Sequence, residues 1–365
     1  MRRRTKIICT IGPATASFDG LKALFEAGMN VVRINMSHSD HASAAKIINW
    51  IKTLNRQVDY PVPILLDTQG PEIRTGVLEN PMELNSGDVV TLSVRDGDLI
   101  EQRSIHVNYT ELVDVVEVGR IITVDNGLMN FKVLQKKDHQ LTCEVIDGGT
   151  LGSRKHVNLP GVRVNLPAIT AKDREDITFG MENDVDFIAL SFVRSPDDVK
   201  ELQEFLGSKR QTTKIVAKIE DQEGVNKIHE IVAVSDGVMV ARGDLGIETD
   251  IADLPNIQRR IVHACAKKGK RCIVATHLLE SMIDNPIPTR AEVTDVANAI
   301  YEGVDSVMLS GETSVGSYPQ RCVEQLSRIA DRTERFPGLG YEKALEIDND
   351  KQHVAIHTVA LAEAV

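Results

Sequence analysis

KIVAKIEDQEG at residues 214–224 is an apolar run that ends in charged residues, and SDGVMVARGDLGIE at residues 235–248 repeats this pattern. Side chains alternate between the two faces of a strand, so Val216, Lys218 and Glu220 share one face. Asp244 follows the second strand, and ligand sites of parallel α/β proteins lie at the carboxyl ends of strands. Two carboxylates and an ammonium at such ends predict a site for a divalent cation and a phosphorylated anion. Solvated or salt-bridged charges are the alternative interpretation.

The same strand–turn–helix pattern repeats along most of the chain. Besides the two strands quoted above, we expect strands at residues 6–11, 30–35, 63–66, 186–192, 272–276 and 306–309. The expected helices are residues 19–27, 43–54, 170–181, 196–206, 225–233, 255–267, 290–301 and 318–332. Eight strand–helix units are the number in a TIM (β/α)8 barrel.

Residues 72–166 have a different character, with short strand patterns separated by Asp-Gly, Asn-Gly and Gly-Gly turns. This composition predicts an all-β domain inserted into the barrel. We therefore expect a first barrel part at residues 1–71, the inserted domain at 72–166, and a second barrel part at 167–339. Residues 340–365 hold one helical pattern, at 353–364, which we interpret as the remnant of a C-terminal α/β domain because a single helix cannot bury itself.

Composition narrows the class of protein. The net charge is −11 and aromatic residues make up 4% of the 365 residues, which argues against a nucleic-acid partner. No stretch approaches the roughly 18 apolar residues of a membrane span. The five cysteines show no CxxC spacing, which favours reduced thiols and a cytoplasmic location.

Two further strand ends carry polar residues. Arg33, Asn35 and Ser37 share one face of their strand, and Asp67 and Thr68 end the next one. A guanidinium matches a phosphate bidentately, and oxygen donors suit hard cations rather than zinc. A hydrogen-bonded turn network is the alternative for this set.

These strand ends belong to a series of motifs that occur in a characteristic order. The series is NMSH at 35–38, LDTQGPEIRTG at 66–76, LGSRKHVNLPG at 151–161, KIE at 218–220, MVARGDLGIE at 239–248, ATHLLESMI at 275–283, PTRAEVTDVANA at 288–299 and MLSGETSVGSYP at 308–319. In this order they resemble pyruvate kinase, over residues 5 to about 335. The resemblance implies a barrel whose inserted β domain closes as a lid, and transfer of a phosphoryl group from phosphoenolpyruvate to ADP, the last step of glycolysis.

The resemblance also implies the role of each site residue. Glu220 and Asp244 correspond to the ligands of Mg²⁺ or Mn²⁺, and Asn35, Ser37, Asp67 and Thr68 to the K⁺ site. The residues implied in substrate binding are Arg33, Lys218, Gly243, Asp244 and Thr276. Of these, Lys218, Thr276 and Arg33 are the implied catalytic residues, with Lys218 on the migrating phosphoryl group and Thr276 near the face where the enolate is protonated. Arg74, Lys155, Asn35 and Asp125 correspond to contacts of the nucleotide and its metal.

Departures from the family pattern leave alternatives open. His277 stands where Gln is common, and Gln69 and Arg154 replace common lysines. The largest departure is that only the first helix of the C-terminal domain is expected here. In the family that domain holds the sugar-phosphate site and much of the oligomer interface. From that remnant we expect hyperbolic kinetics without sugar-bisphosphate activation, and a weakened homo-oligomer. A metal-dependent lyase or aldolase acting through a pyruvate enolate, or a non-catalytic remnant, are the alternatives to an active kinase.

The residue at position 72 indicates whether the implied K⁺ site is needed for activity, and here it is Glu72. In the family, Glu at this position accompanies dependence on K⁺, whereas Lys accompanies independence from it. We therefore expect K⁺-dependent activity. An ion pair of Glu72 with Arg74 is the alternative role of this carboxylate.

Overall fold

The computed structural model describes residues 3–95, 103–162 and 164–336. The remnant predicted at residues 340–365, with its helix at 353–364, lies outside these ranges. In the described part of the chain, no helix combines the length and apolar character that crossing a bilayer requires.

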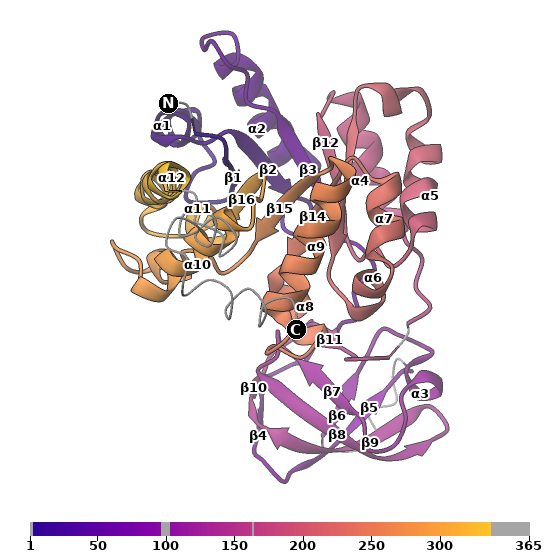
Figure 1. Cartoon of the computed structure of the whole chain (residues 1–365). Coiled ribbons are helices and arrows are strands. Elements are labelled where there is room, and N and C mark those ends of the chain that lie inside the picture. Colours follow the sequence, from indigo (N-terminus) through magenta and orange to yellow (C-terminus); the bar gives the residue numbers. More distant parts are fainter. Residues whose placement is uncertain (1–2, 96–102, 163, 337–365) are drawn as a thin grey trace, which may run out of the picture.

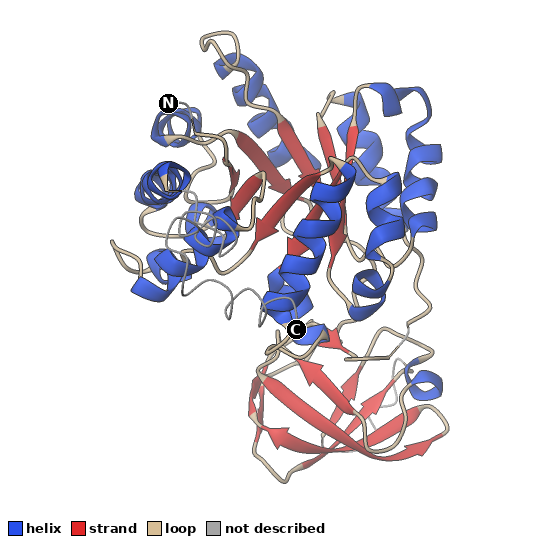
Figure 2. Ribbon diagram, viewed as in Figure 1, coloured by secondary structure: helices blue, strands red, loops and turns tan. Residues whose placement is uncertain are grey.

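Eight parallel strands close into a barrel (Figure 2). Around the barrel they run in the order β1 (Lys6–Thr10), β16 (Ser306–Leu309), β15 (Arg271–Ala275), β14 (Gly237–Ala241), β13 (Lys214–Ile219), β12 (Phe187–Leu190), β3 (Ile64–Asp67) and β2 (Val31–Asn35). The predicted TIM barrel is therefore confirmed, with all eight strands near their expected positions.

The barrel helices form an outer layer around these strands. The longer ones are α1 (Phe18–Ala27), α2 (His41–Leu54), α4 (Ala171–Glu182), α5 (Pro196–Leu206), α7 (Ile228–Val234), α9 (Leu254–Lys268), α10 (Arg290–Tyr301) and α12 (Pro319–Arg335). Local sequence sets their ends: Thr170 and Asp173 form a capping box at the start of α4, and Gly269 ends α9 in the left-handed conformation.

The helix expected at residues 225–233 is in fact two helices. Asp221 caps a short α6 (Gln222–Asn226) by accepting a hydrogen bond from the Gly224 amide at 2.8 Å, and α7 starts after Lys227. Asp221 is the second residue after β13, so the chain turns into a helix shortly after the strand ends.

Strand alternation places two apolar layers on either side of the barrel wall. Val216 and Met239 face a small cluster inside the barrel, whereas Ile215, Ala217 and Ile219 pack in the large cluster between strands and helices. The side-chain period of two therefore points Lys218 inward, as expected from its place beside Val216.

A separate β domain is inserted between β3 and β12 and lies at one end of the barrel, beside α8 (Arg242–Glu248) (Figure 1). It has a six-stranded sheet in the order β11-β7-β8-β9-β5-β6 and a two-stranded sheet of β10 with β4. The strands are β4 (Met82–Leu84), β5 (Val89–Ser93), β6 (Ser104–His106), β7 (Ile121–Val124), β8 (Met129–Lys137), β9 (Gln140–Asp147), β10 (Gly149–Leu151) and β11 (Val157–Asn158). One short helix, α3 (Leu112–Val115), was not expected from the sequence. Its four residues are too few for an amphipathic period to be visible.

The remaining short elements lie in the loops of the barrel. They are the 3₁₀ helices η1 (Gly207–Gln211) and η2 (Glu280–Ile283) and the helix α11 (Gly311–Ser314). The carboxyl ends of the barrel strands and the inserted domain thus lie on the same side of the molecule.

Candidate active site

A polar cleft of about 350 Å³ lies between the barrel and the inserted domain. The barrel lines it with Arg33, Asn35, Ser37, His38, Ser191, Phe192, Lys218, Glu220 and Asp244, and the inserted domain with Asp125, Asn126, Arg154, Lys155 and His156. Gln69, Glu72 and Arg74 line it from the connection between the two. Charged residues therefore converge on one cleft from segments more than 200 residues apart.

Lys218 lies at the floor of this cleft and is held from three directions. Its Nζ lies 3.0 Å from Asp67 Oδ1 and 3.0 Å from Glu220 Oε1, and donates a hydrogen bond to Ser191 Oγ at 2.7 Å. Burial by itself lowers the pKa of Lys218, but the charges of Asp67 and Glu220 outweigh it and raise the pKa above its ordinary value. The ammonium is therefore charged and fixed in position.

Arg33 is held in a similar way. Its Nε donates to Asp67 Oδ2 at 2.7 Å and its NH1 group to Thr10 Oγ1 at 2.9 Å. Asp67 is fully buried, which alone would raise its pKa, but Lys218 and Arg33 lower the pKa below its ordinary value. One carboxylate thus orients two cations at the floor of the cleft.

Glu220 and Asp244 supply the acidic side of the cleft. Burial, with a contribution from Asp244, raises the pKa of Glu220 even though Lys218 lowers it. Glu220 Oε2 also accepts a hydrogen bond from the Phe192 amide at 2.6 Å. The two carboxylates therefore repel each other across the cleft, and a cation between them would relieve that repulsion.

The donor set fits hard cations. Among the described residues, no three His, Cys, Asp or Glu side chains gather into a complete metal cage. A divalent cation on Glu220 and Asp244 would accordingly take its other ligands from substrate oxygens and water, as Mg²⁺ commonly does. Asp67 Oδ1 is buried as well, but it lies 3.0 Å from Lys218 Nζ and is therefore already engaged by a positive side chain.

Backbone strain marks the strand ends around the cleft. Phe192, Thr276 and His277 have φ values of 52°, 74° and 52°, which non-glycine residues adopt rarely. Arg242 donates hydrogen bonds to the carbonyls of Thr276 (2.7 Å) and His277 (3.2 Å), and pairs with Asp295 at 2.8 Å. Such strain persists where the surroundings hold it, and it clusters at functional sites.

Comparison with known proteins identifies the family. A family model described as "Pyruvate kinase, barrel domain" matches residues 2–323. This chain belongs to the pyruvate kinase family.

Individual relatives agree with this assignment. Plastidial pyruvate kinase 2 of Arabidopsis thaliana is 47% identical over 335 residues, which are 92% of this chain and 58% of that protein. Pyruvate kinase of Clostridium perfringens is 47% identical over 334 residues, 91% of this chain and 70% of the relative. Pyruvate kinase of Geobacillus stearothermophilus is 48% identical over 339 residues, 92% of this chain and 58% of the relative. This chain therefore spans between about three fifths and seven tenths of the length of these pyruvate kinases.

The residues predicted from the pyruvate kinase pattern fall into two groups. The structure brings Arg33, Asn35, Ser37, Arg74, Asp125, Lys155, Lys218, Glu220 and Asp244 to the walls of the cleft. The other predicted residues, Asp67, Thr68, Gly243 and Thr276, are not among its lining residues.

Asp67, Thr68 and Gly243 adjoin residues that line the cleft, and Thr276 adjoins Gly243. Asp67 forms ion pairs with Lys218 and Arg33. The Thr68 hydroxyl donates a hydrogen bond to the Ala189 carbonyl (3.2 Å) and accepts one from the Ser191 amide (3.1 Å). A Cβ atom on Gly243 would lie 3.3 Å from Thr276 Cγ2, so these two residues adjoin each other.

The predicted nucleotide contacts are engaged with other residues. Lys155 Nζ pairs with Asp125 Oδ2 at 2.7 Å, and Arg74 Nε pairs with Glu72 Oε2 at 2.7 Å. The ion pair of Glu72 with Arg74, considered above as an alternative role of Glu72, is thus present. Gln69 donates to the same Glu72 oxygen at 3.0 Å.

Sequence reasoning missed several supporting residues of the cleft. Thr10, Ser191 and Arg242 hold Arg33, Lys218 and the Thr276 carbonyl, respectively. Ser191 and Arg242 each follow directly on a strand, β12 and β14, so their position at a carboxyl end was a usable signal. Thr10 is the last residue of β1 and so also lies at a carboxyl end, but a threonine in a strand is most often a structural residue.

Proposed function

We propose that this chain transfers the phosphoryl group of phosphoenolpyruvate to ADP, giving pyruvate and ATP. The observation that carries the proposal is the placement of Lys218, pinned by Asp67, Glu220 and Ser191 at the floor of a cleft that also holds Arg33 and Asp244. Phosphoryl transfer depends mainly on positioning and electrostatic stabilisation, and this arrangement supplies both.

Arg33 and Lys218, which both pair with Asp67, act on the migrating group. Arg33 binds a substrate phosphate oxygen, and Lys218 offsets charge as the bond from phosphorus to the enol oxygen breaks and the bond to the ADP oxygen forms. Gly243, Asp244 and Thr276 receive the substrate carboxylate. The enolate left behind takes a proton at carbon near Thr276, which yields pyruvate.

The proposed reaction requires two kinds of cation, a divalent metal ion and K⁺. Glu220 and Asp244 hold Mg²⁺ or Mn²⁺, which when bound supplies positive charge to the phosphoryl and enolate oxygens. Asn35, Ser37, Asp67 and Thr68 hold K⁺, for which an all-oxygen set is suited.

The inserted domain takes part through the nucleotide. Arg74, Lys155 and Asn35 contact ADP, and Asp125 lies beside Lys155 at the turn between β7 and β8. The proposal includes the domain limits given above. The barrel comprises residues 1–71 and 167–339, the inserted domain at 72–166 acts as a lid, and residues 340–365 are the remnant of a C-terminal domain.

We place the protein in the cytoplasm, as a homo-oligomer without nucleic-acid or membrane partners. All five cysteines are free and buried, which is compatible with a reducing compartment. Static light scattering on the purified chain would give the number of subunits.

A coupled assay tests the activity. Pyruvate formed from phosphoenolpyruvate and ADP is reduced by lactate dehydrogenase, and the loss of NADH absorbance is followed while Mg²⁺, Mn²⁺ and K⁺ are varied one at a time. The expected result is turnover that requires ADP and a divalent cation. Absence of pyruvate under all these conditions would contradict the proposal.

A further inference from the structure

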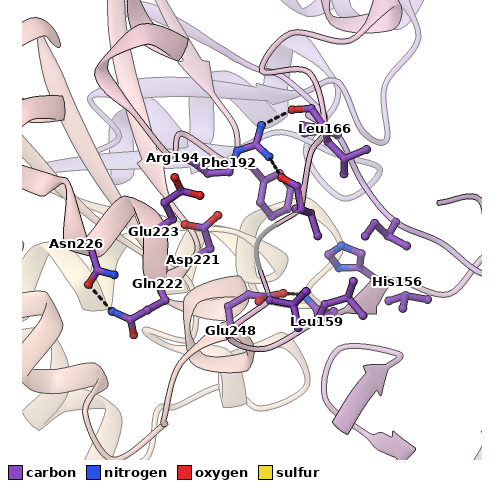
Figure 3. A pocket seen from close by; sticks show the side chains of 17 residues that line it. His156, Leu159, Leu166, Phe192, Arg194, Asp221, Gln222, Glu223, Asn226 and Glu248 are labelled. Atoms are coloured by element: carbon purple, nitrogen blue, oxygen red, sulfur yellow. Dashed lines mark hydrogen bonds between the residues drawn. The ribbon is translucent and has the colours of Figure 1, made fainter. Parts of the chain in front are cut away.

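The helix α8 carries a carboxylate whose hydrogen-bond partners belong to the inserted domain. Glu248, the last residue of α8, accepts a hydrogen bond at its Oε1 from Nδ2 of Asn158, at 2.7 Å. The backbone of Leu159 also hydrogen-bonds to this carboxylate, and the two residues lie beside each other at the junction (Figure 3). Because Asn158 ends β11, these contacts join the inserted domain directly to the barrel.

The length of α8 sets the distance between Glu248 and Asp244, a ligand of the proposed divalent metal ion. The two residues are four positions apart, so they lie on the same side of the helix, about one turn from each other. Burial raises the pKa of Glu248 to about 7, and the charges of Asp221 and Asp244 contribute to this rise, in agreement with the spacing. Whatever Glu248 holds is therefore also fixed relative to Asp244.

In the inserted domain, the contact lies close to the proposed nucleotide residues. Asn158 is the third residue after Lys155, and the intervening segment pairs with the end of β7. There the Asp125 amide donates to the His156 carbonyl at 2.9 Å, and the Asp125 side chain pairs with Lys155 at 2.7 Å. The segment that Glu248 holds is thus the segment that carries Lys155.

The turn after β7 makes a second contact with α8. A Cβ atom on Gly127 would lie 3.7 Å from Ile247 Cγ1, so this turn adjoins the same helix. One contact would leave the inserted domain free to rotate about it, whereas two contacts restrict the rotation. The Glu248 contact is the directional one of the two, because it consists of hydrogen bonds.

We propose that Glu248 is a positioning residue, which holds the segment of Lys155 at the distance from Asp244 that ADP binding requires. The consequence for ADP rests on the proposed function, whereas the contact itself does not. Hydrogen bonds to a charged group are stronger than those between neutral groups, so loss of this contact should shift the inserted domain toward released positions by about tenfold or more.

Spin-label distances test the positioning without any catalysis. Lys132→Cys in β8 and Glu204→Cys in α5 provide exposed labelling sites on the two domains, whereas the native cysteines are buried. Double electron–electron resonance at pH 8, where Glu248 is ionised, gives the distribution of distances between the labels. Asn158→Asp places two carboxylates against each other, so its distribution should be roughly twice as wide as that of the wild type. An unchanged distribution would overturn the proposal.

Two further variants separate this effect from a general loss of structure. Glu248→Gln combined with Asn158→Asp exchanges donor and acceptor, so the double variant should return to the width of the wild type. Asn130→Asp is the matched control, because Asn130 donates to Asp147 at 2.8 Å within the inserted domain, and it should leave the width unchanged. A double variant as broad as Asn158→Asp would contradict the pairing. If Asn158→Asp fails to fold, Glu248→Ala replaces it, with the same expected widening.

Steady-state kinetics test the consequence for ADP. In Asn158→Asp the KM for ADP should rise about tenfold, while the KM for phosphoenolpyruvate, which barrel residues bind in the proposed function, should change less than twofold. The double variant should recover the KM for ADP, and an active Asn158→Asp with an unchanged KM for ADP would overturn the positioning role. If the wild type forms no pyruvate, the proposed function fails, and the distance distributions still decide whether Glu248 holds the inserted domain.

Discussion

Lys218 Nζ lies 3.0 Å from Asp67 Oδ1, at the point where strands β13 and β3 end inside the barrel. Asp67 in turn holds Arg33 through its other oxygen at 2.7 Å. The buried carboxylate therefore compensates two positive side chains that the proposed chemistry needs at fixed positions. This relationship links the stability of the barrel to its function.

Replacing Asp67 should therefore destabilise the protein. Asp67→Asn keeps the size of the side chain but leaves two buried cations with less compensation, and breaking such a pair costs about 3 kcal/mol. Urea unfolding followed by circular dichroism measures the change. The matched control is Asp197→Asn, which breaks an exposed ion pair with Lys200 and should leave the unfolding midpoint unchanged. Equal midpoints for both variants would contradict the role assigned to Asp67.

The Glu248 carboxyl should make stability depend on pH. Its pKa rises from the ordinary 4.5 to about 7 on folding, mainly by burial. Between these values the folded protein keeps a proton that the unfolded chain has released, so this group makes the folded state less stable as pH rises. Glu248→Gln should therefore gain stability relative to the wild type from about pH 4.5 to 7, and no more above pH 8. A difference that stays constant over this range in urea unfolding would refute the argument.

The barrel and most residues of the cleft could be predicted from the sequence, and the reason is physical. Strand alternation decides which side chains face inward, and the carboxyl ends of parallel strands meet, so the amino-acid pattern alone brings Lys218, Glu220 and Asp244 together. The contacts of Lys218 with Asp67 and Ser191 could not be predicted in this way, because alternation and strand direction bring residues to the same edge of the barrel but do not decide which side chains pair there. The hydrogen bond of Asn158 with Glu248 also escaped prediction, since it depends on how the inserted domain packs on α8.

Potassium should be required for activity. Glu72 places a negative charge beside a cleft that receives an anionic substrate, and its pairing with Arg74 does not add a net positive charge there. Turnover should fall strongly when K⁺ is replaced by tetramethylammonium at equal ionic strength. Glu72→Lys should recover part of it, because an ammonium would stand in for the ion.

Glu72→Gln is the control for this prediction. It removes the ion pair with Arg74 without adding a positive charge, so it should not restore turnover in the absence of K⁺. Equal rates of the unmodified protein with and without K⁺ would show that Glu72 is a structural ion-pair partner only.

The most direct test of the central claim is the rate of pyruvate formation by the wild type and by Lys218→Met, at saturating phosphoenolpyruvate, ADP, Mg²⁺ and K⁺. Removing a preorganised charge at a transition state typically costs about two to three orders of magnitude in rate. Far-UV circular dichroism and Mn²⁺ binding, followed by electron paramagnetic resonance, control for the fold and for the site of Glu220 and Asp244. We expect a wild type that turns over and a folded, Mn²⁺-binding Lys218→Met that is slower by a factor of roughly 100 or more. A Lys218→Met variant with turnover close to that of the wild type would contradict it.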